Sequence, residues 1–241
     1  MSFPFIEHVA WLHSTGAEWA ARARWRGAPV WHARRAGEPL AACADLLEQA
    51  PRGPVRFLDR ATLLLGFPHV HYLMLPWQTG LYSRDDWQGF AEATFSQHVG
   101  LDPQVWQVQL ADGAFGQQRL AVATSRALLQ DLRDLFKLNH LPLVTCEPLL
   151  TAVARQYWRR LPDDCVLAVP EAEGLSCLYR QQGVIDQVCA IPTPPDSALS
   201  DNLFTAGLLV ERPALPPRVV ANTPTDNRLG PVHPWLEEPS A

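Results

Sequence analysis

The sequence predicts an α/β fold, and the clearest evidence lies between Arg119 and Trp158. Two short apolar segments in this stretch, 120–123 and 143–146, have the length and composition of buried strands. After each of them, apolar residues recur at helical spacing, and the first helix has charged residues on its opposite face. Strand, helix, strand and helix joined by short connections are typical of an α/β layer.

The ends of the two helices carry their own signals. Ser125 stands where an N-cap belongs, because its hydroxyl can accept a hydrogen bond from a free N–H of the first turn. Asn139 and Pro142 end this helix. Pro148 suits the first turn of the second helix, where an N–H would have no partner, and this helix is expected to reach Trp158.

The first 50 residues are expected to hold three strands and a helix. Residues 3–13 have the composition of a strand. Within 18–25, tryptophan or alanine at every second position alternates with alanine or arginine, which is the period of two of a strand. A turn at 26–29 leads to a third strand at 30–34. Pro39 then opens a helix with apolar residues on one face.

The middle of the chain continues with strands and one capped helix. Ser83 and Asp86 resemble a capping box, and the aromatic-rich helix that follows ends at Gly100. Strands are expected at 61–65, 69–75, 105–110 and 118–123.

Toward the C-terminus a strand and a hairpin precede a proline-rich region. The three strands are expected at 165–170, 175–180 and 184–191. From Thr193 onward, prolines interrupt any regular element. Residues 203–210 are expected to form a short helix or strand, and the remainder a mobile tail.

Composition excludes several classes of function. The chain has 241 residues, 47% of them hydrophobic, which is enough for a substantial core. A net charge of −5 argues against a general nucleic-acid partner. The only lysine, Lys137, is followed by Leu138, so the chain has no Walker-type phosphate loop.

Motifs for catalysis, metal binding and targeting are also missing. The sequence has no Gly-x-Ser-x-Gly elbow, dinucleotide fingerprint or His-Glu-x-x-His, so we predict no catalytic or cofactor-binding residue. His69 and His71 share a strand face but lack further ligands, and no Cys-x-x-Cys pair exists, so no metal is predicted. With no signal segment and no membrane-spanning run, we expect a soluble cytoplasmic protein.

The stretch 60–192 resembles a known family of assembly proteins. A strand and helix followed by Leu-Pro-Leu-Val-x-x-Glu-Pro at 141–148 and a new helix are similar to the middle of the actin-like assembly proteins of type IV pili and type II secretion. These are the PilM-type proteins and the cytoplasmic domains of GspL-type proteins. Leu75-Pro76 resembles the leucine–proline pair that precedes the inserted subdomain in these proteins.

This resemblance implies a partial actin-like, ribonuclease H-like fold with an inserted helix–strand–strand–helix–strand subdomain. The subdomains implied are 1–80 for the first, 81–147 for the insertion, 148–193 for a return helix and a truncated second lobe, and 194–241 for the proline-rich tail. Full-length relatives need about a hundred further residues to complete the second lobe, as the resemblance implies.

Two departures from the family concern phosphate binding. Nucleotide-binding relatives carry Asp-x-Gly in two turns, but residues 13–16 here are His-Ser-Thr-Gly, without an Asp. In the second turn, 169–174, Glu171 and Glu173 stand where a phosphate would lie. Carboxylates repel phosphate unless a metal intervenes, so the resemblance implies a degenerate member that holds no nucleotide.

Three functional hypotheses follow. The first is a non-catalytic scaffold of a pilus- or secretion-type envelope machine, held near the inner membrane by its partners. The resemblance implies that these partners are an inner-membrane assembly protein and an assembly ATPase, and it allows self-association. The second is an actin-like ATPase or sugar-kinase-like enzyme with altered loops, and the third is an unrelated small-molecule-binding α/β domain. The missing Asp residues and the shortened lobe favour the first.

Four apolar residues are candidates for partner binding. Tryptophan is enriched at interfaces as well as in cores, and Trp77 and Trp106 fall outside the clear helical stripes. Either residue can belong to the core or to an interface. Trp235 and Leu236 stand in the proline-rich tail, where large apolar groups are unusual. We predict that they form an anchor on the protein's own body or in a partner groove; the alternative is a tail without contacts.

Overall fold

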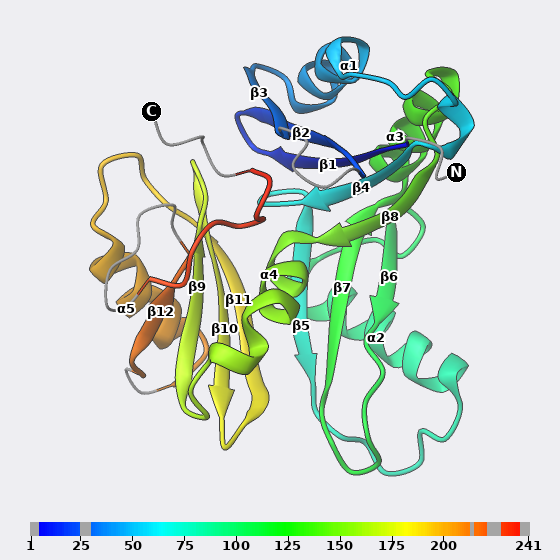
Figure 1. Ribbon diagram of the computed structural model, residues 1–241. Coiled ribbons are helices and arrows are strands. Elements are labelled where there is room, and N and C mark those ends of the chain that lie inside the picture. The colour runs from blue at the N-terminus through cyan, green and yellow to red at the C-terminus, as the bar shows by residue number, and fades with distance from the viewer. Residues whose placement is uncertain (1–4, 25–29, 213–214, 221–227, 237–241) are drawn as a thin grey trace.

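The computed structural model describes residues 5–24, 30–212, 215–220 and 228–236 (Figure 1). The strands in these ranges form three sheets of five, three and four strands. The five-stranded sheet and the helices around it make the first lobe, the three-stranded sheet belongs to the inserted subdomain, and the four-stranded sheet makes the second lobe. Two 3-10 turns, η1 (Arg56–Leu58) and η2 (Trp158–Arg160), lie in the connections.

The five-stranded sheet has the order β3-β2-β1-β4-β8. Its strands are β1 (Ile6–His13), β2 (Gly16–Ala23), β3 (Val30–Ala36), β4 (Arg60–Leu65) and β8 (Leu143–Pro148). The first three strands pair antiparallel as a meander, whereas β4 runs parallel to both β1 and β8. Within the described residues, the three predicted N-terminal strands are therefore confirmed, and β4 joins them across a long connection. The predicted turn at 26–29 lies outside the described residues.

Helices cover both faces of this sheet. α1 (Pro39–Gln49) and α3 (Arg126–Leu138) lie on one side, and α4 (Leu149–Tyr157) lies on the other, toward the second lobe (Figure 1). Trp19 of β2 is fully buried and stacks on Phe136 of α3 with ring centroids 5.7 Å apart. This aromatic pair fixes α3 on the sheet.

The inserted subdomain is a three-stranded antiparallel sheet with the order β5-β7-β6. Its elements are β5 (Val70–Leu75), α2 (Arg84–Val99), β6 (Trp106–Leu110) and β7 (Arg119–Ser125). Ser83 and Asp86 form the expected capping box of α2, and Gly100 ends the helix in the left-handed conformation. Trp87, Ala91 and Phe95 of α2 are buried against the sheet.

The composition of this subdomain differs from the predicted range 81–147. β5 precedes residue 81, yet it pairs with β7 along its whole length. α3 packs on the first lobe, and β8 pairs with β4 there. The prediction grouped neighbours along the chain, whereas backbone hydrogen bonds between remote strands decide which sheet a strand joins.

The second lobe is a four-stranded sheet with the order β11-β10-β9-β12. Its elements are β9 (Cys165–Pro170), β10 (Gly174–Gln181), β11 (Val184–Pro192), α5 (Leu199–Leu209) and β12 (Pro217–Val219). β9, β10 and β11 form an antiparallel meander, and β12 returns to pair parallel with β9. α5 packs on one face through the buried Ala206.

The proline-rich tail is more ordered than the sequence suggests. The described part of 194–241 contains α5, β12 and a segment, 228–236, that runs from β12 to the cavity between the lobes. Leu229 donates a backbone hydrogen bond to Val219, and Leu236 is only 2% exposed within the main core. The expectation of a mobile tail is wrong for these residues, because their apolar side chains gain burial without needing a ladder of hydrogen bonds.

The burial of Leu236 predicts that the C-terminal segment stabilises the whole fold. Replacing Leu236 with Ala should lower the free energy of unfolding by about 2–5 kcal/mol, the usual cost of truncating a buried leucine. Urea denaturation followed by tryptophan fluorescence measures this change. Leu138→Ala is the control, because Leu138 is 77% exposed and its loss should have little effect. Equal stability of wild type and the Leu236 variant would contradict this packing.

Candidate functional site

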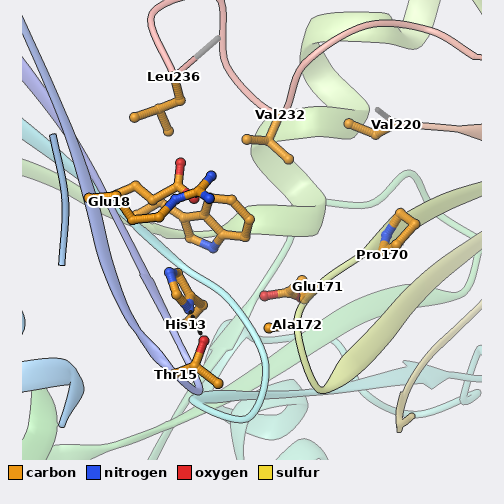
Figure 2. A pocket seen from close by; sticks show the side chains of 11 residues that line it. His13, Thr15, Glu18, Pro170, Glu171, Ala172, Val220, Val232 and Leu236 are labelled. Carbon is orange, nitrogen blue, oxygen red and sulfur yellow. Dashed lines mark hydrogen bonds and ion pairs between the residues drawn. The ribbon is translucent and has the colours of Figure 1, made fainter. Parts of the chain in front are cut away.

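A cavity of about 450 Å³ lies between the two lobes (Figure 2). Segments that are remote in sequence surround it: strands β1 to β3 with the β1–β2 hairpin, the β9–β10 turn, the residue after β12 and the C-terminal segment. Its lining residues are Trp11, His13, Thr15, Glu18, Arg34, Pro170, Glu171, Ala172, Val220, Val232 and Leu236. The two turns that the resemblance assigns to phosphate binding therefore do face one cavity.

The β1–β2 hairpin keeps two buried polar atoms, Nε2 of His13 and the Ser14 hydroxyl oxygen, without a hydrogen-bond partner among the described residues. The Thr15 hydroxyl lies 3.1 Å from Nδ1 of His13. Burial, and secondarily the positive charge of Arg34, lowers the pKa of His13 to about 4, so its ring is neutral at neutral pH. Gly16 has φ +148°, and a Cβ there would stand 2.1 Å from the Arg35 carbonyl oxygen. Gly16 therefore serves the tight hairpin, as expected for a turn residue.

Glu18 forms the polar wall of the cavity next to the hairpin. Its side chain is buried, and one carboxylate oxygen lies 2.6 Å from Nη2 of Arg34. The other oxygen lies 3.8 Å from Nε2 of His32. The positive charge of Arg34 is thus already paired within the protein, which reduces its attraction for an anionic ligand.

Glu171 closes the cavity from the opposite lobe, and its carboxylate is held by the protein itself. The backbone N–H of Phe67, in the β4–β5 loop, donates to Oε2 at 2.8 Å. The Ser176 hydroxyl donates to Oε1 at 3.3 Å. The Trp11 indole nitrogen is close to the same carboxylate but outside hydrogen-bond geometry. The Phe67–Glu171 hydrogen bond joins the two lobes directly.

Two glycines allow this close approach of the loops. A Cβ on Gly66 would stand 2.0 Å from Oε2 of Glu171, and a Cβ on Gly174 would stand 2.5 Å from the Phe67 ring. Real Cβ atoms do not approach so closely, so larger residues at either position would push the loops apart. The sequence pointed to Glu171 as an obstacle to phosphate, but it carried no signal for its contact with Phe67.

The environment of Glu171 changes its acidity. Burial raises the pKa of Glu171 to about 7, and the hydrogen bonds from Phe67 and Ser176 only partly oppose this effect. A carboxyl group that titrates near neutral pH can accept or release a proton. Both of its oxygens are nevertheless engaged by donors of the protein, and no group of three metal-ligating side chains occurs among the described residues.

The structure separates the two predicted interface tryptophans. Trp77 follows β5, while Trp106 begins β6 at the opposite end of the three-stranded sheet. Trp106 is half-buried with its ring centroid 4.8 Å from that of His71. Trp77 is half-buried between Trp87 and Phe115, at 5.5 and 4.7 Å. Neither tryptophan is fully buried, and both are packed against the core of the inserted subdomain.

The end of the inserted subdomain that carries Trp77 is strongly aromatic. Phe115 is 85% exposed and contacts Trp77, and Tyr82, in the same loop as Trp77, is 83% exposed. We call Trp77, Tyr82 and Phe115 the aromatic end. A groove of about 640 Å³ runs from Trp77 to the β10–β11 hairpin. Gln118 bridges the groove by donating to the carbonyl oxygens of Ile185 and Asp186, both at 2.8 Å.

The predicted C-terminal anchor contacts the protein's own body. Leu236 and Val232 point into the cavity from the C-terminal segment, opposite His13 and Thr15 (Figure 2). Trp235 is half-buried, with its ring centroid 5.4 Å from that of His233. The sequence allows Leu236 to pack on the protein's own body or in a partner groove. In the structure Leu236 is buried against the protein's own body.

Comparison with known proteins gives matches in structure and none in sequence. No protein-family model matches the chain, and no curated protein matches it significantly. The cytoplasmic domain of EpsL, an inner membrane component of the type II secretion system of Vibrio cholerae, matches with a TM-score of 0.64 and 15% identity. That match covers 98% of this chain and 90% of the EpsL domain.

Two further structures match with TM-scores above 0.5. A Bacteroides thetaiotaomicron protein with an actin-like ATPase fold and unknown function has a TM-score of 0.54 at 7% identity, covering 86% of this chain and 78% of that one. The PilM–PilN type IV pilus biogenesis complex has a TM-score of 0.51 at 13% identity, covering 88% of this chain and 66% of the matched chain. This chain has an actin-like fold. The fold predicted from the resemblance is confirmed.

The matched chains are covered to different extents. The match covers 66% of the matched chain in the PilM–PilN complex and 90% of the EpsL domain. Among the described residues, no helix is both long and apolar enough to cross a membrane.

The raised pKa of Glu171 predicts how stability depends on pH. Because the folded-state pKa is about 7 and the ordinary value is 4.5, the native state binds more protons than the unfolded state between these values. The contribution of Glu171 to stability should therefore fall as pH rises from 4.5 to 7, by roughly 3 kcal/mol. Urea denaturation at a series of pH values measures this slope.

Glu171→Gln should remove that decline, because the amide has the same shape and does not ionise. The variant should match wild type at low pH and exceed its stability above pH 7. Glu173→Gln is the control, because Glu173 belongs to the same turn but is exposed. A wild-type slope that persists in the Glu171 variant would show that another group causes it.

Proposed function

We propose that this chain is a non-catalytic adaptor of a bacterial envelope-assembly machine of the pilus or secretion type. It would act at the cytoplasmic face of the inner membrane by binding an inner-membrane assembly protein, with an assembly ATPase as a further partner. The fold shared with the EpsL cytoplasmic domain and with the PilM–PilN complex supports this proposal. We also propose the organisation into a first lobe, an inserted subdomain and a short second lobe.

One observation carries the non-catalytic part of the proposal. The cavity between the lobes is closed by the Glu171 carboxylate, which is bound by the backbone N–H of Phe67. A second carboxylate, Glu18, is paired with Arg34 on the facing wall. A nucleotide would bring further negative charge to this place, where no free cation compensates it among the described lining residues.

The alternative is an actin-like ATPase or sugar-kinase-like enzyme with altered loops. It is favoured by the cavity itself, because about 450 Å³ of space remains between the lobes. The Thr15 hydroxyl and the Arg34 guanidinium both line this space. The alternative requires that both groups leave their present partners, His13 and Glu18, to contact a phosphate.

Thermal unfolding with and without ATP and Mg²⁺ separates these two functions. A ligand that binds the native state raises the melting temperature by mass action, and a concentration of 100 Kd adds about 2.7 kcal/mol. We expect no rise at millimolar ATP for wild type. A rise of several degrees that is lost in Arg34→Ala would overturn the proposal and establish nucleotide binding in the cavity.

The aromatic end is our proposed partner surface, with Trp77 as its half-buried base. Aromatic rings that gather at one end of a subdomain are the kind of side chain that protein interfaces favour. Trp106 lies at the other end of the same sheet, and we propose that it contacts a separate part of the assembly. Trp235 is half-buried against the main core, and we propose that it is the residue of the C-terminal segment that contacts a partner. The neighbouring Leu236 is buried and holds this segment on the protein.

Phe115→Ala should weaken partner binding without affecting the fold. Phe115 is 85% exposed, so its loss costs little stability, whereas an interface hot spot of at least 2 kcal/mol corresponds to about a 30-fold loss of affinity. The measurement is recovery of the inner-membrane protein that co-purifies with wild type from the source bacterium.

Phe57→Ala is the matched control for this surface. Phe57 is also a largely exposed phenylalanine, at 76%, but it lies in η1 of the first lobe. Recovery should be normal with this variant and reduced with Phe115→Ala. Equal recovery with both variants would remove the aromatic end from the proposal, and the adaptor function would then need another surface.

A further inference from the structure

Two cysteines stand directly opposite each other in the second lobe. Cys177 of β10 is the register partner of Cys189 of β11, and both are free thiols. Both pack on the face of the sheet that α5 covers, in the cluster around Ala206. The adaptor function proposed above makes no use of this pair.

The strand geometry brings the two residues within reach of a disulfide bond. Thr193 donates a backbone hydrogen bond to Glu173. Hydrogen-bonded pairs alternate along an antiparallel ladder, so the unshifted register from there makes Cys177 and Cys189 a hydrogen-bonded pair. Such pairs have Cα atoms about 5.5 Å apart, inside the range that disulfides span. The only register shift of this ladder lies beyond the pair, at Tyr179 and Arg180.

The two thiols differ in access and in acidity. Cys177 is fully buried, whereas Cys189 is partly exposed. The interaction between the two neighbouring thiols lowers the pKa of Cys189 and raises that of Cys177. Because the thiolate is the reactive form, Cys189 is suited to react first, with Cys177 as the adjacent second thiol.

The three other cysteines have a different environment. Burial raises the pKa of Cys43 to about 12 and that of Cys146 to about 11, so both stay protonated at neutral pH. Burial also raises the pKa of Cys165. Cys177 and Cys189 are thus the cysteine pair that strand register places face to face in the described chain.

We propose that Cys177 and Cys189 form a reversible oxidation site that takes a peroxide as its oxidant and yields a cross-strand disulfide. The Cys189 thiolate attacks one peroxide oxygen, the O–O bond breaks, and hydroxide leaves and takes up a proton to become water. Cys189 is then a sulfenic acid. Cys177 loses its proton and attacks the Cys189 sulfur, and the hydroxyl group leaves as a second water. Two thiols and one hydrogen peroxide thus give one disulfide and two waters.

The register also predicts that the bond is easily reduced. Cβ atoms of directly opposed residues lie about 4.5–5.5 Å apart, and toward the upper end of this range in hydrogen-bonded pairs. A disulfide needs a Cβ separation of about 3.8 Å, so the strands must draw together, and strained disulfides are more readily reduced. The site is therefore reversible under mild thiol reductants.

The test uses the purified full chain, reduced and then exposed to hydrogen peroxide. After denaturation and alkylation, two of the five cysteines should resist the label, and the linked peptides should contain Cys177 and Cys189. Dithiothreitol should restore all five thiols. Five labelled thiols after peroxide, or oxidation that begins at Cys43, Cys146 or Cys165, would overturn the proposal.

Single variants separate the roles of the two thiols. Cys177→Ala should accumulate sulfenic acid at Cys189, detected by dimedone addition, because the second thiol is gone. Cys189→Ala should leave Cys177 unreacted. Cys43→Ala is the control and should form the disulfide at the wild-type rate. A disulfide between two chains instead of within one, seen on a non-reducing gel, would contradict the cross-strand assignment.

Discussion

A single hydrogen bond, from the backbone N–H of Phe67 to the Glu171 carboxylate, ties the cavity walls of the two lobes together. The donor is well positioned because Gly66 itself donates to the Leu12 carbonyl oxygen of β1 at 2.8 Å, which extends β4 by one residue. Gly66 and Gly174 remove the Cβ atoms that would keep the two turns apart. The close approach of these two turns therefore depends on the absence of a Cβ at Gly66 and Gly174 and on the Glu171 carboxylate.

The same arrangement also sets the energy of the contact between the lobes. An enclosed carboxylate without a cation costs stability, and the raised pKa of Glu171 expresses that cost. In return, the carboxylate accepts hydrogen bonds from the Phe67 backbone N–H and the Ser176 hydroxyl. The Glu171 carboxylate thus links the β4–β5 loop to the β9–β10 turn.

Local signals predicted the elements well, while contacts between remote segments were missed. Ser83, Ser125 and Pro148 mark helix starts at the positions that the structure has, because capping depends on neighbouring residues. The pairing of β5 with β7 and of β12 with β9 depends on residues about fifty apart, which leave no periodic trace. The contact of Phe67 with Glu171 spans 104 positions and is of the same kind.

The C-terminal segment shows why proline-rich sequence is a poor guide to order. The Tyr157 hydroxyl donates to the Pro231 carbonyl oxygen at 2.8 Å, and Gly230, at φ +136°, leaves room for the ring because a Cβ there would stand 2.7 Å from that hydroxyl. Proline has no backbone N–H to donate. Its carbonyl oxygen can still accept a hydrogen bond, and the residues next to it can still pack and form hydrogen bonds. With Val232 and Leu236 directed into the cavity, the segment covers apolar surface between the lobes. Order here comes from side-chain burial and single polar contacts, which composition alone does not reveal.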